Sequence, residues 1–463
     1  MKNLKYIALL TILCITTHSC FKDNDDVPQS ASTVEINNFI WRGMNYFYLY
    51  KADVPDLADN RFDSTQEFQE FLTSKETPED FFDGLLSSVD EFSFLVDDYI
   101  ALEQAFDGIS KNNGMEFGLV RYPDTPSNLF GYVRYVLPDT DAKNKGITRG
   151  MIFNTIDGEQ LTENNYKKLL DPDTYTIGLA TYTDDVITPT NETVSLSKSQ
   201  YQENPIFIAK TITVTGKKIG YLMYNSFTGD FDNQLNNIFN GFKSEGITDL
   251  VLDLRYNGGG SVTSAIDLSS MITGQFNGKV FSTEEWNSDR QDQFGGTNLF
   301  DNTTRSGQPI NSLQLNTVYI LTTRSSASAS ELVINGLNPY INVITIGSST
   351  RGKFQASITL YDAPNFSRSE ASPSHTYAIQ PLVLKSINAA GFTDYFDGFT
   401  PTIEVKENFS NLGKLGDENE PLLQAAINHI TGKRKFQKNI YTIPEIIGDS
   451  KMFSPNYQRM YKD

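Results

Sequence analysis

The chain has 463 residues, 39% of them hydrophobic, and its 31 Phe and 23 Tyr indicate a folded protein with room for about two to four domains. Its formal net charge is −19, and no basic stripe could neutralise phosphates, which excludes a nucleic acid as a partner. The only cysteines are Cys14 and Cys20, so disulfides and cysteine catalysis are not expected. Apart from His18, a histidine triad or a zinc site would have to use His375 or His429. We therefore expect no metal ion and no organic cofactor.

The first residues are typical of an export signal. Lysines precede an uncharged apolar stretch from Tyr6 to Thr17, and the small residue Ser19 stands before Cys20. The apolar stretch is shorter than the roughly 20 residues that a membrane-spanning helix needs. We expect residues 1–19 to be a signal peptide. The end of this stretch resembles a bacterial lipoprotein box, which implies a protein of the cell envelope anchored to the lipid membrane through acylated Cys20, on the periplasmic or the surface-exposed face.

A tether and a helical domain are expected next. Residues 20–32 are acidic and polar, with too few apolar side chains to pack. From residue 33, apolar residues recur at helical spacing, and capping patterns at Ser64 and Thr77 predict two further helices. Residues 33–110 are therefore expected to form an N-terminal helical domain.

Short runs of β type, broken by turns, follow in residues 111–203. The clearest are residues 129–137 and 174–180, and one helix is expected near residues 162–170. The glycine-containing stretches at 114–118 and 146–158 resemble parts of a PDZ domain. Such a domain binds a peptide as an added strand, so the resemblance implies a PDZ-like domain with a bound peptide tail as its partner.

Strand-like and helix-like segments alternate in residues 204–432, which predicts a layered α/β domain with mostly parallel strands. Strands are expected at 218–224, 249–254, 317–321 and 343–346, and helices at 231–242, 261–272 and from 328 onward. The polar segment 284–311 is expected to be a loop over the site, and residues 433–463 form a C-terminal extension. The predicted fold class is a multidomain α/β protein.

Two junctions between a predicted strand and a predicted helix are rich in small residues. At the first, three glycines follow Asn257, and such a run lets backbone N–H groups approach an anion at a helix start. The anion could be an oxyanion or a phosphate. A nucleotide loop would carry a lysine after the glycines, and Ser261 stands there instead. A tight turn without chemistry fits the glycine run equally well.

The second junction holds Ser328, which fits a capping box with Glu331. Downstream, Lys353 stands between Gly352 and Phe354. A lysine in an apolar pocket loses its proton readily, because burial disfavours the ammonium, and the neutral amine can act as a general base toward a serine hydroxyl. From these residues alone, a capping serine and a solvated surface lysine remain alternatives.

Three segments together resemble a known family. They are Val251-Leu-Asp-Leu-Arg-Tyr-Asn-Gly-Gly-Gly260, Ser326-Ala-Ser-Ala-Ser-Glu331 and Gly352-Lys353. In this order they are similar to the signature segments of the C-terminal processing peptidases, also called tail-specific proteases. The resemblance covers roughly residues 110–430, and three ordered motifs are more specific than one. It implies a ClpP- or crotonase-like catalytic core that follows the PDZ-like domain.

The resemblance also implies roles for individual residues. Ser328 corresponds to the nucleophile of the family, and Lys353, at the spacing that the family shows, corresponds to its base. The implied oxyanion donors are the backbone amides of Ala329 and of Gly259 or Gly260. At helix N-termini these amides would stabilise the negative charge of an acyl-transfer intermediate.

A third catalytic residue is less well defined. Many members of the family carry a glutamine four residues after the lysine, whereas this chain has Ser357 there and Gln355 two residues earlier. In a strand, both side chains would point to the same face as that of Lys353. Either Gln355 or Ser357 is therefore expected to hydrogen-bond the amine.

The resulting hypothesis is an envelope serine endopeptidase that hydrolyses peptide bonds in extended or C-terminal segments of proteins. The alternative is a non-catalytic lipoprotein on the same scaffold that binds peptides or apolar ligands. A penicillin-binding type of acyl transferase is a weaker alternative, because its Ser-x-x-Lys motif, met here by Ser195 and Lys198, must open a helix while the surrounding residues alternate as in a strand.

Overall fold

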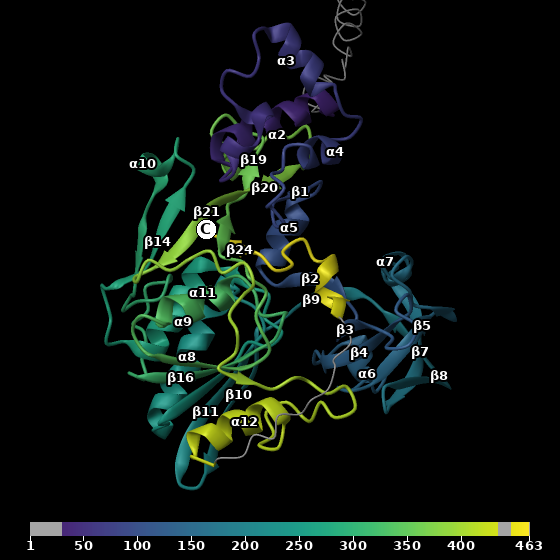
Figure 1. The fold of residues 1–463 in the computed structure, drawn as a ribbon, viewed down its shortest axis with the longest axis vertical. Coiled ribbons are helices and arrows are strands. Elements are labelled where there is room, and N and C mark those ends of the chain that lie inside the picture. Colours follow the sequence, from purple (N-terminus) through teal and green to yellow (C-terminus); the bar gives the residue numbers. More distant parts are fainter. Residues whose placement is uncertain (1–29, 434–445, 463) are drawn as a thin grey trace, which may run out of the picture.

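A computed structural model describes residues 30–433 and 446–462 of the chain (Figure 1). The expected signal peptide, Cys20, most of the tether and the first part of the C-terminal extension lie outside the described residues. Among the described residues, no helix combines the length and the apolar character that a membrane span requires.

The centre of the molecule is a six-stranded sheet in the order β10-β11-β12-β16-β17-β22. Its strands are β10 (Ile206–Val214), β11 (Lys217–Tyr224), β12 (Asp249–Asp253), β16 (Thr317–Thr322), β17 (Asn342–Gly347) and β22 (Ile403–Glu404). The strands from β11 to β22 run parallel, and only β10 pairs antiparallel. The predicted α/β class with mostly parallel strands is confirmed.

Helices cover both faces of this sheet, as Figure 1 shows. Three helices lie on one face and α12 (Pro421–Ile430) lies on the other; the three are α8 (Asp232–Glu245), α9 (Val262–Thr273) and α11 (Ala329–Leu337). Side chains alternate along β12, so that Leu250 and Leu252 pack toward the three helices while Val251 packs toward α12. Burial of each such side chain contributes about 1.5–3 kcal/mol, which fixes the strand register.

A second six-stranded sheet lies beside the helices and has the order β13-β24-β18-β21-β14-β15. Its strands are β13 (Gly260–Ser261), β14 (Val280–Trp286), β15 (Thr297–Leu299), β18 (Gln355–Ser357), β21 (Leu382–Asn388) and β24 (Met460–Tyr461). The expectation of a loop over residues 284–311 was wrong in part, because β14 and β15 form an antiparallel hairpin around α10 (Gln291–Phe294). The polar residues of this segment include Glu284, whose buried carboxylate accepts a hydrogen bond from Asn298.

The N-terminal part is helical, as predicted, with helices α2 (Thr33–Phe47), α3 (Thr65–Leu72), α4 (Pro78–Asp83) and α5 (Tyr99–Phe106). Ser64 caps α3, because its hydroxyl accepts a hydrogen bond from the Glu67 N–H at 3.2 Å. Thr77 caps α4 in the same way, by accepting from the Asp80 N–H at 3.1 Å. This part is joined to the catalytic core by β1 (Phe94–Val96), which pairs with β20 (Ala378–Gln380); β20 in turn pairs with β19 (Leu360–Tyr361).

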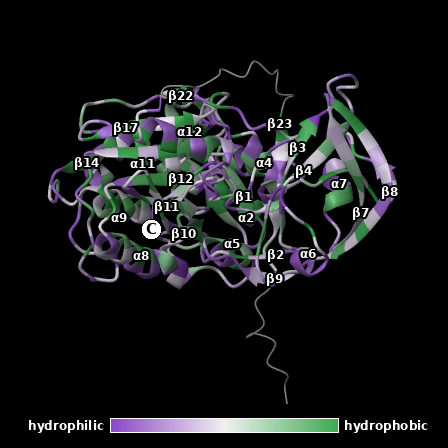
Figure 2. Cartoon of the chain, turned by 90° about the horizontal axis from the view of Figure 1, so that it is seen from below, coloured by the Kyte–Doolittle hydropathy of each residue, from purple (hydrophilic) through white to green (hydrophobic). Residues whose placement is uncertain are grey.

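The β-rich region forms a lobe beside the central sheet (Figure 2). Its main strands are β3 (Met115–Arg121), β4 (Leu129–Val136), β5 (Ile152–Ile156), β7 (Thr174–Thr183) and β8 (Val186–Ser197), with α6 (Asp141–Asn144) and α7 (Tyr166–Leu170) between them. One strand of this sheet, β23 (Ile446–Asp449), comes from the C-terminal extension and pairs antiparallel with β3. The C-terminal extension therefore contributes strands to two sheets: β23 joins the sheet of the β-rich lobe, and β24 joins the second six-stranded sheet.

Candidate active site

Ser328 stands at the turn between β16 and α11, directly before the first residue of the helix. Its side chain is fully buried, and its backbone has φ +66° and ψ −117°, a conformation that a residue other than glycine adopts only under strain. The hydroxyl oxygen, Oγ, has no hydrogen-bond partner among the described residues. A strained turn that aims an unpartnered hydroxyl at a helix N-terminus is suited to nucleophilic attack, because the helix amides there favour negative charge.

Neighbouring serines hold this turn in place. The Ser326 hydroxyl donates to the Leu254 carbonyl at 2.7 Å, and the Ser330 hydroxyl donates to the Asn257 carbonyl at 2.9 Å. Both acceptors belong to the segment that follows β12, the strand next to β16. The two junctions that the sequence singled out are thus bonded to each other.

The glycine run lies against Ser328. A Cβ atom on Gly259 would lie 2.6 Å from the Cβ of Ser328, and one on Gly260 would lie 2.2 Å from the carbonyl oxygen of Phe227, so neither position has room for a side chain. Both glycines also have positive φ, +114° and +133°. The Gly259 N–H donates within its own turn to Asn257 Oδ1 at 2.9 Å, whereas the Gly260 N–H donates to a distant carbonyl. Of the two implied oxyanion donors, Gly260 is the one whose N–H donates to a group outside its own turn.

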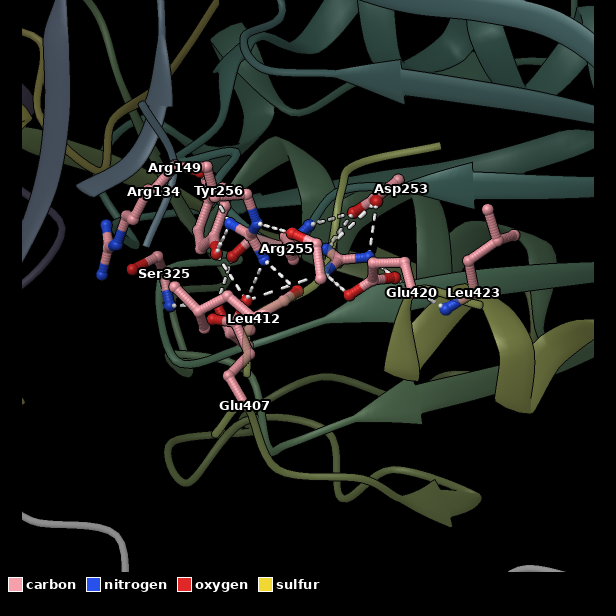
Figure 3. A network of polar contacts seen from close by, with 12 residues as sticks. Arg134, Arg149, Asp253, Arg255, Tyr256, Ser325, Glu407, Leu412, Glu420 and Leu423 are labelled. Carbon is pink, nitrogen blue, oxygen red and sulfur yellow. Dashed lines mark hydrogen bonds and ion pairs between the residues drawn. The ribbon is translucent and has the colours of Figure 1, made fainter. Parts of the chain in front are cut away.

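The Arg255 guanidinium anchors the start of the glycine run in a buried network of polar contacts (Figure 3). It binds Glu420 with two hydrogen bonds, at 2.6 and 2.9 Å, and Asp253 through Nε at 2.9 Å. The Glu420 carboxylate caps α12 by accepting from the Leu423 N–H at 2.9 Å. The guanidinium therefore links the end of β12 to the helix on the far face of the sheet, which keeps the catalytic turn rigid.

A second part of the same network reaches the β-rich region. Arg149 donates to the Tyr256 hydroxyl at 2.8 Å and to Glu407 at 3.0 Å, and Tyr256 in turn bonds Glu407 (Figure 3). Arg134, from β4, forms a buried ion pair with Asp449 at 2.8 Å. The contacts of Arg149 fix the β-rich lobe against Tyr256, two residues before the glycine run, and the Arg134–Asp449 pair joins β4 to β23 within the lobe.

Lys353 follows β17 and is fully buried. Burial lowers the pKa of its amine well below the ordinary value, and the nearby Arg459 lowers it further. Its Nζ lies 5.1 Å from the centroid of the Phe92 ring and donates to the Gln458 carbonyl at 3.2 Å. The surface-lysine alternative is therefore wrong. In this structure the amine bonds the C-terminal extension, and the Ser328 hydroxyl is free.

Glu331 ties the serine to the lysine. Its buried carboxylate accepts from the backbone N–H groups of Ser328 and Lys353, both at 2.8 Å and both on Oε2. The other oxygen, Oε1, accepts from the Gly352 N–H at 2.7 Å and from the Thr350 hydroxyl at 2.6 Å. The capping-box pattern signalled Glu331, but only as a cap of its own helix, and its contact with the lysine segment was missed.

Neither candidate for the third catalytic residue reaches the lysine amine. Gln355 donates to the Tyr50 hydroxyl at 2.8 Å, and Ser357 donates to Gln380 at 2.5 Å. The expectation that both side chains share the face of Lys353 depended on a regular strand. Strand β18 instead begins at Gln355, so Lys353 precedes it and does not share its alternation.

Other polar candidates lie elsewhere. His375 pairs with Asp362 at 3.1 Å, and Ser195 lies in strand β8, which argues against the acyl-transferase motif that needs a helix. Within residues 30–433 and 446–462, no group of three or more His, Cys, Asp or Glu side chains is placed as metal ligands would be.

Comparisons with known proteins point to a family of peptidases. The family profile described as Peptidase family S41 matches residues 218–369, and the profile described as Peptidase S41 N-terminal domain matches residues 35–94. A carboxyl-terminal-processing protease of Picosynechococcus is 26% identical over 166 residues, which are 36% of this chain and 36% of that protein. The match thus spans about a third of the relative's length.

Two solved structures are also similar. A protein from Bacteroides fragilis assigned to the S41 proteases is 27% identical, with a TM-score of 0.66 over 85% of this chain and 97% of that one. The photosystem II D1 C-terminal processing protease is 17% identical, with a TM-score of 0.52 over 85% of this chain and 100% of that one, and shows a likeness in fold.

Proposed function

Since the chain belongs to peptidase family S41, the family of the C-terminal processing peptidases, we propose that it is a serine endopeptidase that cuts extended or C-terminal segments of proteins through a Ser328–Lys353 dyad. The observation that carries this proposal is the arrangement around Glu331. One carboxylate oxygen bonds the backbone of a strained, buried serine and that of a buried lysine with a lowered pKa.

The reaction begins when the neutral amine of Lys353 turns from the Gln458 carbonyl to the Ser328 hydroxyl and takes its proton. The Ser328 oxygen then bonds the substrate carbonyl carbon, and the N–H groups of Gly260 and Ala329 stabilise the oxyanion. Ala329 is the first residue of α11, so its N–H has no acceptor one turn earlier within the helix.

The intermediate collapses when the protonated lysine gives its proton to the leaving nitrogen and the carbon–nitrogen bond breaks. A water molecule then loses a proton to the lysine, and its oxygen attacks the acyl group. Breakage of the bond between the acyl carbon and the Ser328 oxygen returns the proton to the serine. The two hydrolysis products leave, and no cofactor is needed at any step.

Digestion of an unfolded model protein such as casein tests this function. Wild type, Ser328→Ala and Lys353→Ala are compared with two matched controls at exposed positions, Ser369→Ala and Lys243→Ala. We expect the wild type and both controls to cut, and the first two variants to be inactive while they keep the wild-type circular dichroism. Full activity in either of those two would refute the dyad.

We also propose that residues 111–203 act as a PDZ-like domain that binds a peptide tail by strand addition. The pairing of β23 with β3 supports this, because it shows that β3 accepts an added antiparallel strand. Substitutions on β3 that keep its fold should weaken the binding of tail peptides in calorimetry and leave the hydrolysis of short peptides unchanged. Equal binding would refute the assignment.

Anchoring in the cell envelope through acylated Cys20 is a further proposal, and it rests on the sequence. Mass spectrometry of the membrane fraction should find a lipid on Cys20 of the wild type and release of the Cys20→Ser variant from the membrane. An unmodified Cys20 in the mature protein would refute it.

A further inference from the structure

The part of the extension that the structure describes, residues 446–462, is here called the C-terminal segment, and it connects the β-rich lobe to the catalytic residues. Its first strand, β23, adds to the edge of β3, and the Phe117 N–H next to this pairing donates to Ser450 Oγ at 3.1 Å. Its last strand, β24, lies parallel between β13, which begins at the oxyanion glycine Gly260, and β18, which follows Lys353. The segment thus runs from a strand-accepting edge into the catalytic groove.

The backbone of the C-terminal segment bonds the catalytic groups themselves. The Gln458 carbonyl accepts from Lys353 Nζ at 3.2 Å, and the Arg459 carbonyl accepts from the Gly260 N–H at 2.7 Å. The Arg459 carbonyl also lies on the same side of Gly259 as the Ser328 hydroxyl. A Cβ atom placed on Gly259 would be 2.6 Å from the Arg459 carbonyl oxygen and 2.9 Å from Ser328 Oγ. A substrate carbonyl must occupy this place to meet both the nucleophile and the oxyanion donor.

Cavities continue the groove on both sides of these contacts. One, of about 570 Å³, is lined by Gly258 and Gln458 and by the earlier part of the C-terminal segment. The other, of about 810 Å³, is lined by Tyr461 and Lys462 together with Trp286. A peptide longer than the segment's contact region would have room on either side.

The side chain of Arg459 occupies a pocket made by the N-terminal region. Its guanidinium donates to the Phe92 carbonyl at 2.6 Å and lies 4.1 Å from the centroid of the Phe94 ring. Burial lowers the pKa of this guanidinium to about 10, and the negative charge of Asp90 offsets part of that shift. An aromatic face, a carbonyl oxygen and a nearby carboxylate together select a cation over a neutral or acidic side chain.

A second basic side chain of the segment is recognised in a similar way three residues later. Lys462 Nζ donates to the carboxylate of Glu284 at 2.8 Å and lies 6.0 Å from the Trp286 ring centroid. The groove therefore offers an acidic and aromatic environment at both positions.

On the basis of the proposed peptidase function, we propose that the C-terminal segment lies along the path of a substrate strand. The substrate residue in the place of Arg459 then has its carbonyl at the Gly260 N–H. Its side chain enters a pocket formed by Asp90, Phe92 and Phe94, which selects a basic side chain. The bond that the enzyme hydrolyses then follows an arginine or a lysine. Because Arg459 fills the pocket in this structure, the C-terminal segment competes with substrates for it.

The test measures peptide binding to the full chain in the absence of hydrolysis. The protein carries Ser328→Ala to stop cleavage and Arg459→Ala to empty the pocket. The probes are two fluorescent nonapeptides with the sequence of residues 454–462, one with arginine and one with alanine at the position of Arg459. We expect the arginine peptide to bind about 10-fold more tightly, a value between those of an exposed and a desolvated cation–π contact.

Two further substitutions locate the preference. Phe94→Leu keeps an apolar side chain but removes the aromatic face, and Asp90→Asn removes the charge; each should reduce the 10-fold preference to about threefold or less. The matched control is Phe62→Leu, which removes a cation–π contact of the same kind between Phe62 and Arg61, at 4.8 Å. It should leave the preference unchanged.

The outcomes separate this inference from the proposed function. Equal binding of the two peptides, or a preference that survives Phe94→Leu and Asp90→Asn, overturns the pocket even if the enzyme digests casein. If the preference depends on Phe94 but the protein with an intact Ser328 cuts no substrate, the result supports the pocket and overturns the peptidase function. With an intact Ser328, Arg459→Ala should lower KM for the arginine peptide several-fold; an unchanged KM would refute the competition.

Discussion

Substitution of Glu331 examines how strongly one carboxylate holds the catalytic segments together. In the wild type its two oxygens accept four hydrogen bonds, two on each oxygen. In Glu331→Gln, the amide nitrogen is best accommodated on the side of Thr350, whose hydroxyl can rotate and accept a hydrogen bond. The remaining oxygen then keeps the bonds from Ser328 and Lys353, and only the Gly352 N–H loses its acceptor.

The expected cost follows from the number of buried donors that lose a partner. An unsatisfied buried N–H costs about 1–3 kcal/mol, so Glu331→Gln should lower the free energy of unfolding by about that amount. Glu331→Ala leaves three backbone N–H groups without an acceptor, those of Ser328, Gly352 and Lys353, and should cost about 3–9 kcal/mol. We expect kcat/KM to fall about 10-fold in the glutamine variant and at least about 100-fold in the alanine variant, because a misplaced nucleophile loses its alignment.

Urea unfolding and peptide hydrolysis provide the two readouts, with Glu370→Gln as a control at an exposed position. A change in the midpoint at a constant slope reports the stability difference. If the glutamine and alanine variants lose equal stability, or if the alanine variant loses less than about 1 kcal/mol, the hydrogen bonds counted here do not hold the site.

Three other predictions concern the site. Arg255→Met leaves buried carboxylates without their cation and should cost about 3–5 kcal/mol in urea unfolding; a loss below about 1 kcal/mol would contradict this. Gly260→Ala should reduce kcat/KM by at least about 100-fold, because its Cβ would lie 2.2 Å from the Phe227 carbonyl oxygen, and normal hydrolysis by this variant would refute the assignment of a tight loop. The lowered pKa of Lys353 favours the neutral amine, so kcat/KM should rise with pH through a midpoint well below that of an ordinary lysine. A midpoint near the ordinary lysine value would show that another group is the base.

The sequence predicted the parts of the fold that depend on local patterns. The apolar run of β12 and the helical spacing in α2 and α8 are properties of neighbouring residues, and the capping residues Ser64 and Thr77 act within one helical turn. The order of the three motifs was sufficient to indicate Ser328 and Lys353 as partners, although their contact through Glu331 needs the fold.

The sequence did not predict the features that depend on distant residues. Gln458 lies 105 residues after Lys353, and nothing in its surroundings indicates that its carbonyl meets the lysine. The two-residue strand β24 is too short for an alternation pattern and forms only because β13 and β18 lie on either side of it. The bulge at Val383 of β21, opposite β18, is invisible in the sequence for the same reason: the register between the two strands determines it.

The central claim is that Ser328 is activated by Lys353, and covalent labelling with a serine-reactive fluorophosphonate tests it most directly. Wild type, Lys353→Ala and the control Lys243→Ala are labelled for increasing times, and mass spectrometry of the digested protein locates the label. The account predicts modification of Ser328 in the wild type and the control, and labelling at least about 100-fold slower in folded Lys353→Ala. Labelling of another serine, or an unchanged rate in Lys353→Ala, would contradict it.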